Sequence, residues 1–523
     1  DQVGPPGKPL RPLYDAQIQH SGHPIALVVA ETYEAARAAA ELIDVAYETE
    51  PHQTDLALAR PQAYVPPKRR SGITPPPKPK GDAAEAYAQA PARVWGEFHI
   101  PAEHHNPMEL FATTVVWQGD GGLLVHDKTQ GVQNARDYVC SVFGLAKDKV
   151  QVKSPYVGGG FGSGLRPQHQ LFLAVMAALA LERSVRVELT RAQMFHFTHR
   201  PETFNEVWLG ATADGDLQAL RHEAIASTST YEDHQEVVVN WSTLLYSTPN
   251  ALQTYKLAKL DIPTPGDMRA PGAPLGVFAL ESAMDELAYE TGLDPIELRL
   301  RNYTQRDEND GREYTSKALR ACYGEGAERF GWSRRNPAPR SMREERELIG
   351  WGMASGAWEA SFMKTSARAT FSGDGRLEVA SATSDIGTGT YTVLTQIAAD
   401  ALGLPMEKVS ALIGDSSLPY SPVEGGSWTA ASAGSAVDAA CAALRTELLA
   451  CAAKAPNSPF SSAKESEVVF SDGRILLASD PSVGVDLRDA LRAAGRSSVS
   501  AERTVGPSMI EQMRSVSYTH SAV

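Results

Sequence analysis

Residues 155–164 read PYVGGGFGSG, and the last seven of these positions hold five glycines and one aromatic residue, Phe161. Glycine is entropically costly to hold in one conformation, so such a cluster marks a tight turn or a close approach of the backbone to a ligand. The apolar residues of Val150–Val157 predict a strand before the loop, and the apolar stripe that starts at Leu171 predicts a helix after it. We therefore expect a strand, a glycine loop and a helix, with a ligand near the loop.

Upstream of this unit, residues 1–60 carry the pattern of a small α/β domain. Ile25–Ala30 predicts a strand, which a helix and a second strand follow before residue 50. Residues 61–92 form the expected linker, and its first part, PQAYVPPKRRSGITPPPKPKG, is rich in proline and basic residues. Such a composition favours an extended, exposed connector.

Two larger α+β domains are expected after the linker, over residues 93–345 and 346–523. Residues 302–341 are polar and predict irregular structure. Asp294-Pro295-Ile296-Glu297 has an N-cap, a first-turn proline and an N3 glutamate, and so predicts a helix start. The other expected elements are strands at Val94–Ile100 and Thr113–Trp117, and helices at Val132–Phe143, around Val277, Leu280, Met284 and Leu287, and at Val393–Leu402.

A weak internal echo joins the two domains. Residues 143–150 lead from a predicted helix through Gly144 into a strand, and residues 402–409 do the same through Gly403. The echo indicates either two similarly built halves or chance use of a common turn.

Length, charge and hydropathy exclude several classes of protein. The 523 residues exceed the usual size of one hydrophobic core, so several domains are expected. The formal net charge of -14 disfavours binding to nucleic acid or anionic lipid. The longest apolar run, Leu171–Leu181, is too short to span a bilayer, so no membrane span is expected.

The four cysteines, Cys140, Cys322, Cys441 and Cys451, include no CxxC pair. We expect free thiols, and no iron–sulfur cluster or disulfide framework in this chain.

Three loops place glycines and hydroxyl residues at predicted helix starts, where free backbone N–H groups and the helix dipole attract anions. They are the glycine loop, residues 385–390 (DIGTGT) and residues 425–432 (GGSWTAAS). Together they indicate a large ligand that carries phosphate. A fourth loop, residues 268–272 (MRAPG), adds the guanidinium of Arg269, which can orient an anionic or carbonyl oxygen.

A nicotinamide dinucleotide site is one alternative for the glycine loop. Glu188, at the end of the next strand, suits the ribose contact of such a site, but Ser163 stands where the dinucleotide fingerprint needs glycine. No phosphate-loop lysine follows either.

The motifs GGGFG, MRAPG, DIGTGT and GGSWTAASAGSA occur in this order, and residues 105–109 (HNPME) precede them. In this arrangement the chain resembles the molybdenum hydroxylases of the xanthine dehydrogenase and aldehyde oxidase family, from about residue 20 to the end. Within that family it is most similar to the molybdenum-binding large subunits of bacterial aldehyde oxidoreductases. The resemblance implies a partial hammerhead-like α/β domain, followed by two elongated α+β cofactor-binding domains, the second one truncated.

The resemblance also implies the cofactor and the residues near it. The expected cofactor is molybdenum held by molybdopterin cytosine dinucleotide, with no FAD or iron–sulfur cluster in this chain and no metal bound directly by its side chains. Gln130 and Arg269 match the family's residues beside the metal. The full set expected to bind the cofactor is Gln130, Gly131, Gly160, Phe161, Gly162, Arg269, Ile386, Gly387, Thr388, Gly389, Thr429 and Ala430.

The implied reaction is oxidation of an aldehyde to a carboxylic acid with oxygen from water, and electrons pass to iron–sulfur and FAD subunits. Leu165 replaces the glutamate of purine-oxidising members, so aldehydes or apolar aromatics are the expected substrates. Ala270 replaces the cysteine of carbon monoxide dehydrogenases. Hydroxylation of an N-heterocycle stays an alternative, and the compartment stays open between cytoplasm and periplasm.

One family motif has no match in these residues. The family's catalytic glutamate lies on a Gly-Val/Ile-Gly-Glu loop, which does not occur here. We therefore expect a fragment of a longer product that is inactive by itself, with a non-catalytic scaffold as the alternative.

Overall fold

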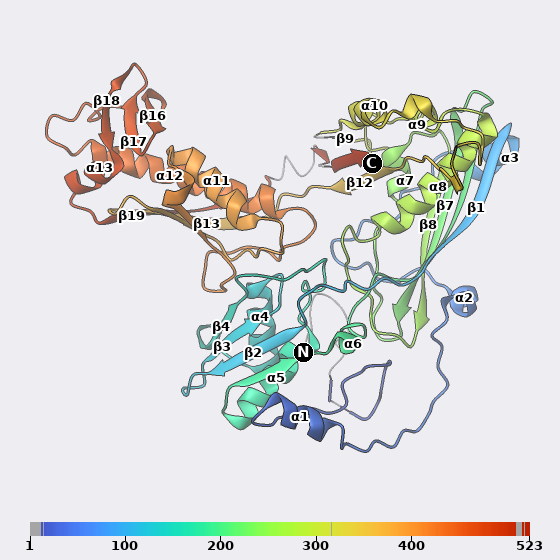
Figure 1. Cartoon of the computed structure of the whole chain (residues 1–523), viewed down its shortest axis with the longest axis horizontal. Helices are drawn as coiled ribbons and strands as arrows, with labels where there is room; N and C mark the ends of the chain where they lie inside the picture. The colour runs from blue at the N-terminus through green and yellow to red at the C-terminus, as the bar shows by residue number, and fades with distance from the viewer. Residues whose placement is uncertain (1–11, 14, 315, 509–514, 517, 523) are drawn as a thin grey trace.

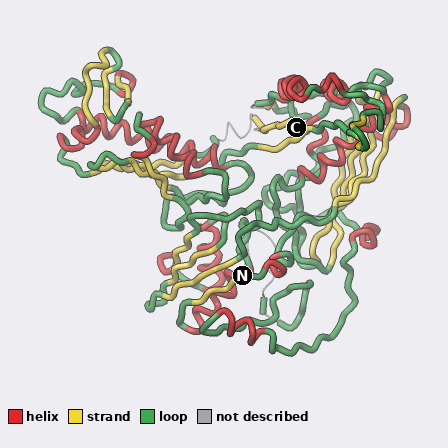
Figure 2. Tube along the Cα trace, viewed as in Figure 1, coloured by secondary structure: helices red, strands yellow, loops and turns green. Residues whose placement is uncertain are grey.

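The computed structural model describes residues 12–13, 15–314, 316–508, 515–516 and 518–522. Its mixed sheets and helices confirm the predicted α+β class. Three lobes surround a common centre: a sheet with helices at the bottom, a long twisted sheet at the upper right, and a second sheet with helices at the upper left (Figure 1). In each lobe, helices lie against the strands (Figure 2).

The bottom lobe is a four-stranded sheet in the order β4-β3-β2-β5, in which β3 and β4 are parallel and the other neighbours are antiparallel. Its core joins strand residues such as Val115 and Val152 to helix residues such as Leu171 and Val175. Gly144 ends α4 in the left-handed conformation (φ 68°), as its position predicts. The elements are β2 (Ala112–Trp117), β3 (Leu123–Asp127), α4 (Val132–Phe143), η2 (Lys147–Lys149), β4 (Val150–Lys153), α5 (His169–Leu181), β5 (Val185–Glu188) and α6 (Arg191–Met194).

The long sheet of the right lobe has the order β1-β6-β7-β8, and α8 packs against β1 and β6. Asp294 caps α9 by accepting a hydrogen bond from the N–H of Ile296, as predicted. The buried guanidinium of Arg299 binds Glu281 and Asp285, which fastens α9 to α8. The elements are β1 (Ala92–Ile100), β6 (Thr203–Ala211), β7 (Leu217–Ser229), α7 (Trp241–Leu245), β8 (Ala251–Leu260), α8 (Ala273–Thr291) and α9 (Pro295–Arg301).

The left lobe repeats the plan of the bottom lobe. Its sheet has the order β15-β14-β13-β19, again with one parallel pair, β14 and β15, and antiparallel neighbours elsewhere. Helix, left-handed glycine, 3-10 turn and strand follow one another at Gly403 as they do at Gly144. The echo in the sequence is therefore a structural repeat. The elements are β13 (Thr365–Ser372), β14 (Leu377–Ala380), α11 (Thr390–Leu402), η4 (Met406–Lys408), β15 (Val409–Leu412), α12 (Thr429–Ala452) and β19 (Ser498–Val505).

An insertion between α12 and β19 forms the outer end of this lobe (Figure 1). A three-stranded antiparallel sheet carries α13, whose residues Leu487 and Leu491 are buried in the same core as α12. The elements are η5 (Glu465–Glu467), β16 (Val468–Ser471), β17 (Arg474–Leu477), β18 (Asp480–Asp486) and α13 (Leu487–Ala493).

The segment between the two repeats stays with the right lobe. β12 pairs with β21 and contacts α8, and α10 contacts β21, so the repeat proper begins at β13. The elements are β9 (Glu313–Tyr314), α10 (Leu319–Phe330), η3 (Trp332–Arg334), β10 (Arg343–Glu344), β11 (Glu347–Leu348), β12 (Ser355–Glu359), β20 (Ser515–Val516) and β21 (Tyr518–Ala522). The predicted boundary near residue 345 falls inside this segment, between β10 and β11.

The amino-terminal part contains the predicted helix, α1 (Tyr33–Ala40), but neither predicted strand. Ile25–Ala30 is extended, yet no neighbouring strand pairs with it in the described part of the chain, and Ile25 and Val29 are more than 40% exposed. The strand prediction is wrong here because strand formation needs a ladder partner as well as an apolar run. α2 (Leu56–Ala59) and η1 (Arg60–Gln62) follow.

The expected linker is extended, but it is partly paired with the right lobe. Tyr64 bridges Leu257 and Lys80 bridges Ala251, both in β8, and α3 (Ala83–Gln89) packs on β6 and β7. The linker therefore lies along β8 and is not a free tether.

Two other predictions need correction. The strand expected over Val150–Val157 ends at Lys153, because the N–H of Ser154 donates to Gly414 O in the second repeat (2.8 Å). The stretch expected to be irregular contains α10, which buries little beyond Leu319 and Tyr323 and so gives a weak apolar period.

All four cysteines are free thiols, three of them buried, as predicted. Within the part of the chain that the structure describes, no helix combines the length and the apolar character that a membrane crossing requires.

Candidate functional site

A cavity of about 1760 Å³ is lined by residues of all three lobes. This volume exceeds the roughly 300–1,000 Å³ of an ordinary small-molecule pocket, so the cavity suits a large ligand. Nine of the twelve predicted cofactor-binding residues line it: Gln130, Phe161, Gly162, Arg269, Ile386, Gly387, Thr388, Thr429 and Ala430.

Gln130 ties the glycine loop to the second repeat. Its side chain is 1% exposed, and its Oε1 accepts hydrogen bonds from the N–H groups of Gly162 (3.1 Å) and Gly164 (3.0 Å). Its Nε2 donates to the carbonyl oxygen of Glu424 (2.8 Å). A carboxamide has two N–H donors, so the second Nε2–H has no acceptor among the described residues.

Several N–H groups of the glycine loop have acceptors within the protein. The N–H of Gly158 donates to Glu109 Oε2 (2.7 Å), and Gln130 occupies two further loop amides. In addition, α5 begins only at His169, beyond the loop. The N–H groups of Gly162 and Gly164 therefore position Gln130, and the amino end of α5 lies beyond the glycines.

Close packing explains the glycines themselves. A Cβ at Gly162 (φ +107°) would lie 2.0 Å from Asp267 O, and one at Gly160 would lie 2.6 Å from Gln130 Oε1. Phe161 adopts the left-handed conformation (φ 55°), and its side chain, which is 41% exposed, lies on the cavity wall. The loop thus brings one phenyl ring to the cavity by keeping its neighbours without side chains.

The loop that carries Arg269 is fixed by its backbone. The N–H of Arg269 donates to Phe161 O (2.9 Å), and Arg200 Nη2 donates to Arg269 O (3.1 Å). Ala270 has a φ of 59°, a strained conformation for a residue with a side chain. The guanidinium of Arg269 makes no hydrogen bond or ion pair within the described part of the chain, so it is free to bind an oxygen in the cavity.

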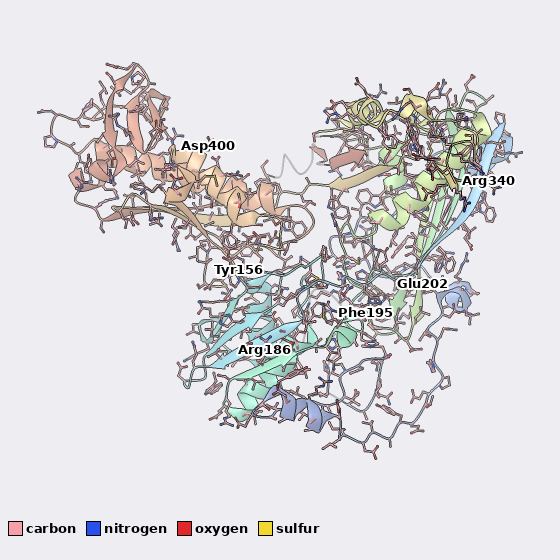
Figure 3. The ribbon with its side chains drawn as sticks, viewed as in Figure 1. Tyr156, Arg186, Phe195, Glu202, Arg340 and Asp400 are labelled. Carbon is pink, nitrogen blue, oxygen red and sulfur yellow. The ribbon has the colours of Figure 1, made fainter. Side chains whose placement is uncertain are left out.

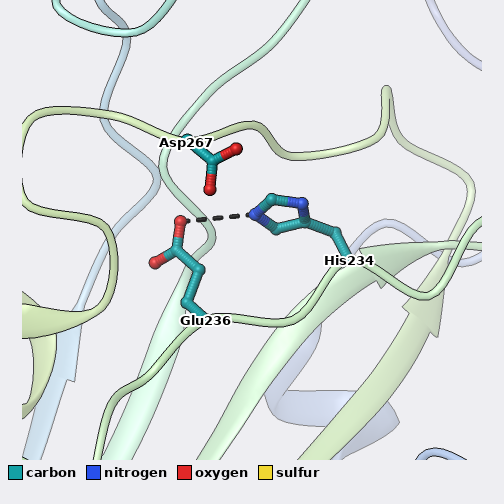
Figure 4. A group of neighbouring side chains, drawn as sticks. All are labelled: His234, Glu236 and Asp267. Atoms are coloured by element: carbon teal, nitrogen blue, oxygen red, sulfur yellow. Dashed lines mark hydrogen bonds and ion pairs between the residues drawn. The ribbon is translucent and has the colours of Figure 1, made fainter. Parts of the chain in front are cut away.

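Behind this loop lies a buried ion network (Figure 4). Potential ligand atoms of His234, Glu236 and Asp267 lie within 4.8 Å of one another, and His234 Nε2 is 3.3 Å from Glu236 Oε1. However, Arg70 binds both oxygens of Asp267, and Arg166 Nη2 lies 3.4 Å from His234 Nδ1. These two cations disfavour a metal ion, so the network braces Asp267 and the loop after it.

The pKa values of the two carboxyls in this network diverge. Burial raises the pKa of Glu236 to about 8. Burial also acts on Asp267, but hydrogen bonds from Arg70 outweigh it and hold the pKa of Asp267 below its usual range. A neutral Glu236 and an ionised Asp267 are therefore expected near pH 7.

Residues 386–389 form an open turn before α11. Gly387 (φ +98°) and Gly389 (φ +80°) have no atom within 4 Å of a built Cβ, so space remains above the turn. Asp385 Oδ1 accepts the N–H of Gly387 (2.8 Å) and fixes the turn. Thr388 presents its hydroxyl beside the cavity.

Sequence reasoning missed Glu424, which lines the same cavity. Its side chain is buried, and its Oε1 accepts hydrogen bonds from Thr388 Oγ1 (3.2 Å) and Thr390 Oγ1 (3.3 Å). Its Oε2 has no partner among the described residues. Burial, and then repulsion by Asp385, raise the pKa of this carboxyl to about 8. The available signal was its place directly before Gly425.

Three predicted residues do not line the cavity: Gly131, Gly160 and Gly389. Gly131 is the N-cap of α4, and a Cβ there would lie 2.5 Å from Val423. Gly131 and Gly160 allow the loops to approach one another, whereas Gly389 is the N-cap of α11 in the left-handed conformation (φ +80°). The sequence also gave no signal that linker residues 70–78 form part of the wall.

Glu188, which a nicotinamide site would need, is not among the lining residues. Its carboxylate pairs with Arg186 Nη2 (2.5 Å) on β5. Glu188 is therefore not placed to make a ribose contact in this cavity.

The two repeats meet beside the cavity. The hydroxyl of Tyr391, on α11, donates to Pro155 O (2.7 Å), and its ring lies 5.4 Å from that of Tyr156. Figure 3 shows Tyr156 at this junction between the bottom and left lobes. The amino ends of α4, α11 and α12 come together here, and such ends favour anionic groups.

Comparison with known families shows which family the chain belongs to. Residues 67–303 and residues 325–520 each match a molybdopterin cofactor-binding domain, and residues 3–51 match the a/b hammerhead domain of aldehyde oxidase and xanthine dehydrogenase. The chain belongs to the aldehyde oxidase and xanthine dehydrogenase family. It is 38% identical, over 83% of its length, to the aldehyde oxidoreductase molybdenum-binding subunit PaoC of Escherichia coli (strain K12). It spans 59% of that protein's length.

More distant relatives share the fold of this family member. The chain is 28% identical to the aldehyde oxidoreductase of Megalodesulfovibrio gigas over 57% of its length, which is 34% of that protein. Quinoline 2-oxidoreductase from Pseudomonas putida 86 has a TM-score of 0.81 at 21% identity, over 94% of this chain and 66% of the other. The family matches confirm the predicted hammerhead domain and the two cofactor-binding domains.

The residues present fit a molybdopterin cofactor. The cavity is large, three helix amino ends adjoin it, and threonine hydroxyls and open glycines line it. The guanidinium of Arg269 and the buried carboxyl of Glu424 add polar groups suited to phosphates and a pterin. The Oε2 atom of Glu424 has no hydrogen-bond partner among the described residues.

Proposed function

We propose that this chain is the molybdenum-binding part of a multi-subunit enzyme that oxidises aldehydes to carboxylic acids. The observation that carries the proposal is the placement of Gln130, Phe161 and Arg269 around one cavity in a member of this family. Its 38% identical relative is named an aldehyde oxidoreductase subunit, which favours an aldehyde as substrate.

The cofactor we propose is the cytosine dinucleotide form of molybdenum molybdopterin. Its phosphates would lie at the amino ends of α11 and α12, near Thr388 and Thr429, because these ends offer N–H and hydroxyl donors. Ile386, Gly387 and Ala430 would line the pterin. The bound cofactor would supply the two-electron oxidation of the substrate carbon.

Three side chains would act on the reacting groups. The unpaired N–H of Gln130 would donate to an oxygen of the cofactor, which fixes the cofactor's orientation. Arg269 would stabilise negative charge that develops on the carbonyl oxygen of the aldehyde, an interaction that is strongest where water is excluded. The ring of Phe161 would exclude water and hold the apolar part of the substrate.

The electrons require a route out of the site. The cysteines of this chain are isolated free thiols, which are unsuited to holding a cluster. We infer that separate iron–sulfur and FAD subunits accept the electrons.

Hydroxylation of an N-heterocycle is the second candidate. Trp241 and Trp358 both line the cavity and pack with ring centroids 5.5 Å apart, which would suit a flat aromatic substrate.

The test is to produce the chain with its partner subunits and to compare turnover of benzaldehyde with turnover of quinoline, using an artificial electron acceptor. The proposal predicts benzoate as product and a far higher kcat/KM for benzaldehyde. Preference for quinoline would support the second candidate, and turnover of neither by a molybdenum-loaded complex would contradict both.

A further inference from the structure

Glu424 joins its own loop to two other loops of the site. Its carbonyl oxygen accepts from Gln130 Nε2 and its N–H donates to Gln130 O (2.7 Å), which joins it to the amino end of α4. Its carboxyl accepts from the hydroxyls of Thr388 and Thr390 at the amino end of α11. Its own loop leads within five residues into α12, which begins at Thr429.

The carboxyl of Glu424 is in an unusual environment for an ionised group. It is 4% exposed, and Oε2 is buried without a hydrogen-bond partner among the described residues. The charged group that acts on it is Asp385, of the same sign, and its other neighbours are the two threonine hydroxyls and the backbone of Ser384. An unpaired buried charge costs several kcal/mol, whereas a neutral carboxyl avoids most of that cost.

We propose that Glu424 is a positioning residue that fastens the amino ends of α4, α11 and α12 into one cradle, and that it does so as a neutral carboxylic acid. The role of Glu424 in cofactor binding rests on the proposed function, whereas its role in holding the loops together does not.

The neutral form makes the cradle sensitive to pH in a defined direction. The pKa of Glu424 is about 8 in the folded protein, against an ordinary value of 4.5. When the loops open and water reaches the carboxyl, it releases its proton at any pH between these two values. Opening therefore becomes more favourable as pH rises from 4.5 to 8, and changes little above 8.

Hydrogen exchange tests this in the cofactor-free full chain. Val393, whose N–H donates to Gly389 O (2.9 Å), reports on the start of α11. After correction for the intrinsic exchange rate, we expect its opening equilibrium to rise at least about tenfold between pH 6 and pH 8. Glu424→Gln, which keeps the acceptor and cannot ionise, should abolish the rise, and the exposed control Glu407→Gln should retain it. A pH-independent Val393 in the unaltered chain, or an unchanged rise in Glu424→Gln, would overturn the proposal.

Cofactor retention is the second readout. In the chain produced with its partner subunits, Glu424→Gln should keep the molybdenum content of the unaltered protein, and Glu424→Ala should lose most of it. Equal molybdenum in Glu424→Ala and the unaltered protein would overturn the positioning role. If exchange behaves as expected while no variant and no unaltered protein contains molybdenum, the positioning role stands and the proposed function fails.

Discussion

Replacing Gly162 by alanine tests how tightly the glycine loop is packed against the loop that carries Arg269. The added Cβ would lie 2.0 Å from Asp267 O. An ordinary carbon–oxygen contact is about 3.3 Å, so one of the two loops has to move by about 1.3 Å. The backbone at Gly162 has a φ of +107°, which adds strain for any other residue.

The expected cost has two parts. The unfavourable backbone conformation contributes about 1–2 kcal/mol, and the steric overlap contributes about 1–3 kcal/mol. Gly144→Ala is the matched control, because Gly144 also has a positive φ (+68°) but has no atom within 4 Å of a built Cβ. It should show the first cost alone.

The assays are the apparent melting temperature of the full chain and its molybdenum content when produced with partner subunits. Gly162→Ala should melt several degrees below Gly144→Ala, since a loss of 1 kcal/mol lowers the melting temperature of a domain of about 150–250 residues by about 2–4 °C. It should also lose cofactor, because the shift breaks the hydrogen bond between Gly162 and Gln130, whereas Gly144→Ala should keep it. Equal melting temperatures and equal molybdenum contents would refute the close approach of the two loops.

Substitutions at three further residues test other parts of the site and the fold. Gln130→Leu leaves the N–H groups of Gly162 and Gly164 without an acceptor, and each such group costs about 1–3 kcal/mol. The molybdenum content of the complex should therefore fall, and it should fall less in Gln130→Glu, which keeps an acceptor oxygen. Arg299→Met leaves the carboxylate of Glu281 buried and unpaired, which should cost about 3–5 kcal/mol in thermal unfolding; an unchanged melting temperature would contradict the buried pair. Burial lowers the pKa of His222 to about 3 from 6.5, so acid favours the unfolded chain below pH 6.5 by about 1.4 kcal/mol per pH unit at this site. Urea midpoints measured from pH 7 to pH 4.5 should fall less steeply in His222→Gln, and an unchanged slope would contradict this.

Local patterns were sufficient for the repeated unit and its motifs. Helix ends at Gly144 and Gly403 were visible because a glycine in the left-handed conformation is a local requirement. The cap at Asp294 follows from the same kind of short-range chemistry. The resemblance to the family then indicated which loops to group, and nine of the twelve residues named from it line one cavity.

Long-range partners could not be read from the sequence. Nothing near Gln130 in sequence indicates that its amide holds two glycine N–H groups and a carbonyl 294 residues away. The strand predicted at Ile25–Ala30 is absent for the same reason, since a strand forms only where a neighbouring strand pairs with it. Glu424 was overlooked because its burial depends on three loops at once.

The most direct test of the central claim is anomalous scattering at the molybdenum edge from crystals of the complex that contains this chain. The account predicts one molybdenum peak per chain inside the cavity, near Gln130, Phe161 and Arg269, with density for a pterin dinucleotide that reaches the amino ends of α11 and α12. A molybdenum peak elsewhere in the chain, or a cavity without molybdenum in a complex that turns over aldehydes, would contradict it.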